Sequence, residues 1–175
     1  MAPMGTDTTA DEFRHWRQHT LRQSIDCVGV GVHSGRRAAM VIHPAPIGHG
    51  IAFRRTDLNR TIQARFDRVV DATLSTVIAD ERWASARVGT IEHLMAAFAA
   101  KGIDNALVDI DGPELPILDG SAAPFLFLLD CAGVVEQDAP RPILEVLRAV
   151  RVTDGEAFAE LGPVRTRATP PVLEL

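Results

Sequence analysis

Two helix-like segments interrupt a chain that otherwise consists of short strand-like stretches separated by glycine and proline. In the clearer one, residues 90–101, apolar side chains recur at helical spacing (Ile91, Leu94, Met95 and Phe98). Thr90 is a natural N-cap for it and Gly102 a suitable residue after its end. The second helix is predicted over 121–132 with Ser121 as its cap. We expect the apolar face of the first helix to lie on a sheet, with Glu92 and His93 at the edge of that contact.

The rest of the chain predicts strands and one hairpin. Strand-like segments occupy 18–30, 38–43, 50–54, 61–70, 74–79, 86–89 and 105–110. After Pro140 the pattern changes to two strands, 147–152 and 157–161, joined through Asp154-Gly155, which is a strong hairpin signal. We therefore predict a mobile leader at 1–16, a first domain at 17–138, and the incomplete start of a second domain at 139–175.

Composition limits the class of protein. Of 175 residues, 46% are hydrophobic and 23% charged, which is typical of a globular chain with a core. The net charge of -5 argues against nucleic acid as a partner. Two cysteines, Cys27 and Cys131, do not make a disulfide framework. No signal peptide or transmembrane segment is visible, since the longest apolar run, 122–129, is too short. These features predict a soluble, cytoplasmic protein.

Glu92 and His93 are the first candidates for chemistry, because they lie in the first turn of the clearest helix. A helix N-terminus stabilises a carboxylate by about 0.3–1 kcal/mol, so Glu92 should stay ionised and could act as a general base. His93 could bind a metal through its neutral imidazole. From these two residues alone the simpler interpretation is structural, with Glu92 complementing the helix dipole and His93 filling space near the sheet.

The remaining histidines carry less information. His33 lies in a glycine turn, 29–35, and either approaches a ligand or caps local backbone. His43 and His49 flank Pro44-Ala45-Pro46 and are interpreted as solvated. No histidine lies four positions from His93, so the helix carries no HExxH pair. The glycine turn lacks the lysine and threonine of a phosphate loop.

Six segments, in order and at matching spacing from about Gln18 to Gly162, together resemble the zinc-dependent UDP-3-O-acyl-N-acetylglucosamine deacetylases of lipid A biosynthesis. Any one of them would be weak, but six in order are specific. They are Gly29-Val30-Gly31-Val32-His33-Ser34-Gly35, Pro44-Ala45-Pro46, Phe53-Arg54-Arg55-Thr56-Asp57-Leu58, Thr90-Ile91-Glu92-His93-Leu94, Gly102-Ile103-Asp104-Asn105, and Glu114-Leu115-Pro116-Ile117-Leu118-Asp119-Gly120-Ser121-Ala122-Ala123-Pro124-Phe125.

The resemblance implies an α+β fold: a two-layer sandwich with a mainly antiparallel sheet covered on one face by two helices, a small inserted sheet, and a partial second domain. It makes Glu92 the general base of an amidohydrolase and His93 a zinc ligand. It places His33 near the bound UDP-sugar lipid precursor. Thr73 and Ser75 would contact substrate from the inserted sheet, where many relatives carry methionine and cysteine.

The same resemblance implies that most of the zinc site is missing. The family's other zinc ligands, a histidine and an aspartate, belong to a second domain that this sequence only begins. We therefore expect a chain that is inactive by itself and that exposes a helix face suited to self-association. The alternative is a non-catalytic binding or regulatory module that keeps only the surface of the first domain.

Overall fold

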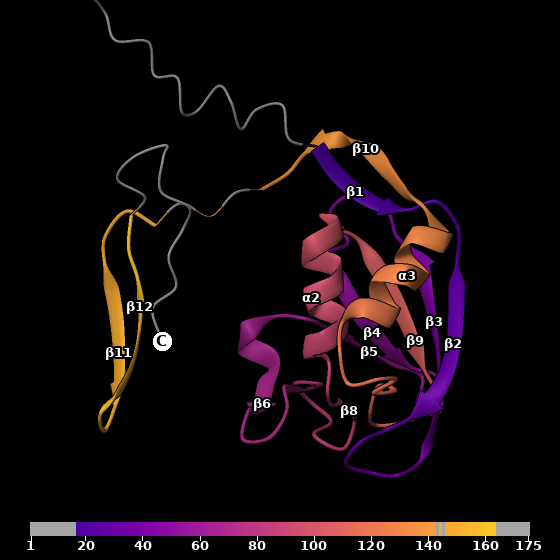
Figure 1. Ribbon diagram of the computed structural model, residues 1–175, viewed down its shortest axis with the longest axis horizontal. Coiled ribbons are helices and arrows are strands. Elements are labelled where there is room, and N and C mark those ends of the chain that lie inside the picture. Colours follow the sequence, from indigo (N-terminus) through magenta and orange to yellow (C-terminus); the bar gives the residue numbers. More distant parts are fainter. Residues whose placement is uncertain (1–16, 143, 145, 164–175) are drawn as a thin grey trace, which may run out of the picture. The chain divides into compact units, whose positions relative to one another are not determined.

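The computed structural model describes residues 17–142, 144 and 146–163 (Figure 1). The predicted leader, residues 1–16, lies outside the described residues. The chain divides between Arg141 and Pro142 into two units, which are described separately below.

The first unit is built on a five-stranded sheet with the strand order β2-β3-β9-β4-β5. Of the four pairs of neighbouring strands in this sheet, three are antiparallel, and the pair β4–β9 is parallel. The strands are β2 (Ile25–Val30), β3 (Arg37–Pro44), β4 (Ile51–Arg55), β5 (Arg60–Gln63) and β9 (Ala106–Ile110). Buried and less buried residues alternate along β3 and β9, as expected when only one face of a sheet is covered.

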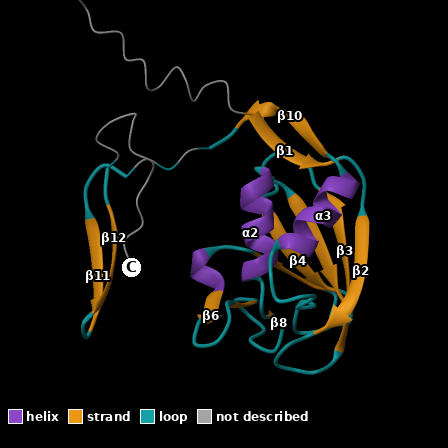
Figure 2. Ribbon diagram, viewed as in Figure 1, coloured by secondary structure: helices purple, strands orange, loops and turns teal. Residues whose placement is uncertain are grey.

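Two helices, α2 (Glu92–Lys101) and α3 (Ala123–Ala132), cover one face of this sheet (Figure 2). Leu94 and Phe98 of α2 and Phe125 and Leu129 of α3 are at most 1% exposed and belong to one apolar core. Burial of each such side chain stabilises the fold by about 1.5–3 kcal/mol. The α+β fold predicted above is therefore confirmed, as is the inward apolar face of the first helix.

A small three-stranded sheet, with the order β6-β7-β8, follows β5. Its strands are β6 (Val69–Asp71), β7 (Val77–Ala79) and β8 (Arg87–Val88). The continuous strand predicted at 61–70 is wrong, because a short 3₁₀ turn, η1 (Phe66–Arg68), separates β5 from β6. A hydrogen bond from the amide of Arg68 to the carbonyl of Arg65, 3.0 Å long, closes this turn.

The first and last strands of this unit, β1 (Arg17–Leu21) and β10 (Val134–Pro140), pair with each other. Sequence patterns did not predict β10, and they predicted one continuous strand over 18–30. That segment is in fact divided, because the amide of Arg22 donates to the carbonyl of Gly133 at 2.8 Å and turns the chain. Its two halves, β1 and β2, then belong to different sheets.

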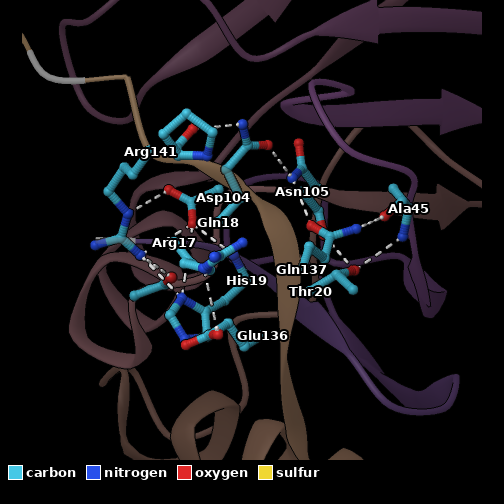
Figure 3. A network of polar contacts seen from close by, with 12 residues as sticks. Arg17, Gln18, His19, Thr20, Ala45, Asp104, Asn105, Glu136, Gln137 and Arg141 are labelled. Atoms are coloured by element: carbon cyan, nitrogen blue, oxygen red, sulfur yellow. Dashed lines mark hydrogen bonds and ion pairs between the residues drawn. The ribbon is translucent and has the colours of Figure 1, made fainter. Parts of the chain in front are cut away.

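A buried amide, that of Asn105, connects the β1–β10 pair to the main sheet (Figure 3). Its Nδ2 atom donates to Oε1 of Gln18 at 2.8 Å and to Oε1 of Gln137 at 2.7 Å. Its Oδ1 atom accepts from the amide of Gly50 at 2.8 Å, and its backbone carbonyl accepts from the hydroxyl of Thr20 at 2.7 Å. All three hydrogen-bonding positions that this side chain uses are satisfied by different segments.

Arg141, the last residue of the first unit, is held at the C-terminal end of α2. Its guanidinium donates to the carbonyl of Gly102 and forms an ion pair with Asp104, Nε to Oδ1, at 2.8 Å (Figure 3). Asp104 also accepts from the amide of His19 at 2.7 Å. The unit therefore extends beyond residue 138, where the sequence analysis placed the boundary, to Arg141.

The described part of the second unit contains the predicted hairpin, β11 (Val150–Asp154) and β12 (Ala157–Leu161). Asp154 pairs with Ala157, so the two loop residues are Gly155 and Glu156. Gly155 has a φ of 58°, which suits the turn. Arg151 lies over the ring of Phe158, 3.8 Å from its centroid, across the two strands. Among the described residues, no helix is long and apolar enough to span a membrane.

Candidate active site

Glu92 and His93 lie at the N-terminal end of α2, and both are half-buried. The next residue, Leu94, is fully buried and anchors this turn of the helix to the core. One carboxylate oxygen of Glu92, Oε2, accepts from the backbone amide of Thr76 at 2.9 Å. This hydrogen bond fixes the carboxylate at the N-terminal end of the helix.

The segment that donates to Glu92 is the turn between β6 and β7. The carbonyl of Thr76 in turn accepts from the amide of Ile91 at 3.4 Å, so Thr76 is tied to the helix start through both backbone groups. Thr73 is exposed and Ser75 is half-buried in the same turn. The structure thus brings the two predicted substrate-contact residues into the segment that meets the predicted general base.

His33 is exposed in the glycine turn that follows β2. The amide of Gly35 donates to the carbonyl of Gly31 at 2.9 Å, which closes the turn. The backbone amides of His33 and Ser34 donate to Oε1 and Oε2 of Glu114, at 2.9 and 2.8 Å. Because these amides already bind a carboxylate of the chain, they are not a free phosphate cradle.

Glu114 is the residue that sequence reasoning did not single out. It is 6% exposed, and besides the two amides its Oε1 accepts from the hydroxyl of Thr90 at 3.1 Å. Burial raises the pKa of this carboxyl, but the hydrogen bonds from His33, Ser34 and Thr90 outweigh that effect, so the pKa lies below its ordinary value. Only a tertiary contact marks this residue, because the proline-containing segment around it has no periodic pattern.

The amide and hydroxyl of Ser121 hold the pKa of Asp119 below its ordinary value, and His93 makes a smaller contribution in the same direction. Among the described ranges no group of three or more His, Cys, Asp or Glu side chains is arranged to hold a metal ion.

Three local predictions about this region were wrong. Thr90 is not the N-cap of α2: it has a φ of 59°, and its hydroxyl donates to Glu114, so Ile91 takes the cap position. Ser121 precedes the cap of α3, Ala122, although its hydroxyl accepts from the amide of Ala123.

The third concerns His43, which is not a solvated side chain. Its Nδ1 lies 2.9 Å from the hydroxyl oxygen of Ser24, and its Nε2 lies 3.1 Å from Oδ2 of Asp109. Asp109 also forms two 2.6 Å hydrogen bonds with the guanidinium of Arg54. His43 therefore belongs to a polar cluster on the main sheet, separate from the start of α2.

Comparison with known proteins gives one consistent family. Residues 18–170 match the family described as LpxC: UDP-3-O-acyl N-acetylglycosamine deacetylase. A UDP-3-O-acyl-N-acetylglucosamine deacetylase from Myxococcus xanthus is 51% identical over 152 residues, which is 86% of this chain and 48% of that protein. Proteins of the same name from Acidithiobacillus ferrooxidans and Stenotrophomonas maltophilia are 47% and 46% identical over 84% of this chain and 48% of their own length. The chain thus spans about half the length of these relatives.

Proposed function

We propose, since the chain belongs to the LpxC family of UDP-3-O-acyl N-acetylglycosamine deacetylases, that its first unit supplies the general base and one zinc ligand for removal of acetate from UDP-3-O-acyl-N-acetylglucosamine. The observation that carries this proposal is the carboxylate of Glu92, fixed by the amide of Thr76 at the N-terminus of α2, with His93 beside it in sequence. The reaction in this proposal is the one given by the description of the family.

Glu92 would act on the attacking water. As water adds to the N-acetyl carbonyl, the carboxylate accepts a proton from it; the carbon–nitrogen bond then breaks, the amine takes up the proton, and acetate leaves. The hydrogen bond from Thr76 occupies Oε2, which leaves Oε1 to face the water. A base that is already oriented loses little freedom when substrate binds.

His93 would serve as one ligand of a zinc ion, whose chemistry is polarisation of the carbonyl and activation of water. A catalytic zinc takes three protein ligands, and the described residues offer no cluster of three around any site. The described residues alone therefore do not fit the ion, and its remaining ligands would come from the half of the relatives that this chain does not span. His33 is proposed to contact the UDP-sugar from the glycine turn, and Thr73 and Ser75 from the turn between β6 and β7.

Zinc affinity tests the assignment of His93. In equilibrium dialysis at neutral pH we expect the chain to bind zinc weakly, because a single imidazole does not hold the ion. The matched control is His49→Ala, which should bind as the unchanged chain does. Tight stoichiometric binding that disappears in His93→Ala would contradict the weak-site proposal and reveal local ligands.

Acetate release tests the assignment of Glu92. We expect the chain alone to give no turnover, and the chain joined to the remaining half of a full-length relative to give zinc-dependent turnover. In the joined protein, Glu92→Ala should lower the rate by about 10²–10⁴-fold, the usual effect of losing a general base. Glu81→Ala, which removes an exposed carboxylate that pairs with Arg68, is the control. An unchanged rate in Glu92→Ala would show that Glu92 is not the general base.

The second candidate is a binding or regulatory module without its own catalysis, which the lack of a three-ligand cluster in the described ranges favours. Such a module would bind a UDP-sugar, or associate through the helix layer, where Phe127 of α3 is 68% exposed. Calorimetric titration with UDP and sedimentation equilibrium separate these outcomes. Binding of UDP that does not depend on zinc, with no turnover in the joined protein, would favour the module.

A further inference from the structure

Glu114 joins two segments that are far apart in the sequence. Its carboxylate accepts from the amides of His33 and Ser34 in the glycine turn, and from the hydroxyl of Thr90 just before α2. A carboxylate offers about four acceptor positions, so three of them are used here, and by groups from two different segments. Donors from any part of the chain could stabilise a buried carboxylate. The donors to Glu114 come from the two segments that carry His33 and Glu92.

The backbone around Glu114 makes the same connection. The amide of Leu115 donates to the carbonyl of Gly89 at 3.1 Å, and the amide of Gly89 donates to the carbonyl of Pro113 at 2.9 Å. The amide of Ile117 donates to the carbonyl of Val30 at 3.0 Å. The segment 113–117 therefore lies between the strand that enters the glycine turn and the residues that precede α2.

Both neighbours of Glu114 show unusual backbone constraints. A Cβ atom at Gly31 would lie 2.3 Å from Oε2 of Glu114, so the carboxylate occupies space that only glycine leaves free. Thr90 is a β-branched residue with a φ of 59°, a left-handed conformation that costs of order 1–3 kcal/mol. Strain of this kind persists where the surrounding contacts fix it, and it clusters at functional sites.

We infer that Glu114 is a positioning residue, which holds the turn that carries His33 and the helix start that carries Glu92 and His93 in one fixed arrangement. It acts through the two amides and through Thr90, and it takes no part in proton transfer. The importance of this arrangement for catalysis rests on the proposed function. The structural link between the glycine turn and the start of α2 does not depend on that function, and it is measured without substrate.

The experiment uses nuclear magnetic resonance of the full chain with Thr90→Val and Thr90→Ser. Valine keeps the shape of threonine but donates no hydrogen bond. The carboxylate of Glu114 then loses one donor, and the hydrogen bonds from the amides of His33 and Ser34 should strengthen. We expect the amide proton resonances of His33 and Ser34 to move downfield in Thr90→Val and to return to their original positions in Thr90→Ser, which keeps the hydroxyl.

A second pair of variants approaches the same link from its centre. Glu114→Gln removes the charge, and we expect it to move the His33 and Ser34 amides upfield and also to shift the amide of Thr76 and the imidazole of His93, on the helix side. Glu81→Gln, an exposed carboxylate paired with Arg68, should move none of them. If Glu114→Gln does not fold, the Thr90 pair decides alone.

Two results would overturn the inference. One is a Thr90→Val spectrum in which only residues near the start of α2 shift, while His33 and Ser34 stay in place. The other is a Glu114→Gln spectrum in which only the glycine turn changes. Either would mean that Glu114 satisfies local donors without linking the two segments. Failure of the proposed function is a separate result, read from acetate release by Glu92→Ala.

Discussion

At the scale of single residues, the close fit between Gly31 and Glu114 leads to a stability prediction. Gly31→Ala would place a methyl group 2.3 Å from Oε2 of Glu114 and 2.5 Å from the hydroxyl of Ser34. Relief requires displacement of a buried carboxylate, so we expect a loss of about 1–3 kcal/mol in the free energy of unfolding, measured with urea. Gly112→Ala, where no atom lies within 4 Å of the added methyl, should change it by less than about 0.5 kcal/mol.

The lowered pKa of Glu114 leads to a prediction about pH. Because the folded state holds this carboxyl below its ordinary pKa of 4.5, its ionisation stabilises the fold above that value, and the contribution is lost as pH falls through the lowered pKa. We expect the unfolding free energies of the unchanged chain and of Glu114→Gln to differ most near neutral pH and to converge as the pH falls below about 4.5. A difference that stays constant from neutral to acid pH would mean that the ionised form is not the one bound.

Sequence patterns predicted part of the candidate site at this scale. Glu92 and His93 were found because helical periodicity marks where α2 begins. Thr90 was wrongly predicted as the N-cap of α2, because its hydroxyl donates to Glu114, a partner that is distant in sequence. Glu114 itself lies in a segment without periodicity, and only its burial and its donors reveal it. The roles of Glu92, His93, His33, Thr73 and Ser75 stay predictions.

At the scale of elements, Asn105 is the connection whose loss should matter most. Asn105→Ala leaves the side-chain oxygens of Gln18 and Gln137 and the amide of Gly50 without this partner in a buried place. We expect a loss of about 2–5 kcal/mol in unfolding free energy, since each abandoned group costs about 1–3 kcal/mol before relaxation.

Asn105→Asp separates hydrogen bonding from packing, because it keeps the volume but replaces two donors with an acceptor. Gln18 and Gln137 cannot compensate by turning their amides over: Gln18 Oε1 also accepts from Gly48, and Gln137 Nε2 donates to the carbonyl of Ala45. Asn105→Asp should therefore be nearly as damaging as Asn105→Ala at neutral pH. Gln63→Ala, an exposed amide on β5, is the control and should be neutral.

Elements defined by local signals were predictable, and those defined by distant partners were not. The β11–β12 hairpin turns at Gly155, which the sequence marks, and α2 ends at Lys101, followed by Gly102 with the expected left-handed φ of 64°. In contrast, β10 forms because it pairs with β1, more than a hundred residues earlier, at registers such as Thr20 with Val135. No local pattern within 134–140 indicates that partner.

At the scale of the whole molecule, the division at Arg141 predicts how far the chain can be shortened. A fragment of residues 17–141 keeps β10 and the ion pair of Arg141 with Asp104, so its unfolding free energy should match that of the first unit in the full chain. A fragment of residues 17–138 loses that ion pair and the hydrogen bond from Gln18 to the carbonyl of Pro140, and we expect it to be less stable by about 2–4 kcal/mol. Equal stability of the two fragments, measured by urea unfolding, would place the boundary at the earlier residue.

The clamp on Arg141 also fixes a distance for the rest of the chain. Arg141 is bound at the C-terminal end of α2, whereas Glu92 is its first residue, and a helix of 10 residues is about 15 Å long. Any chain that runs from Arg141 back to the N-terminal end of α2 must therefore span about 15 Å, or at least about five extended residues. Extra length in such a connector costs little, roughly 0.6 kcal/mol of closure entropy for each doubling. Insertions after Arg141 should accordingly be tolerated. In contrast, the insertion of a single turn in α2 would move its start, held at Glu92, away from its end, held at Gly102.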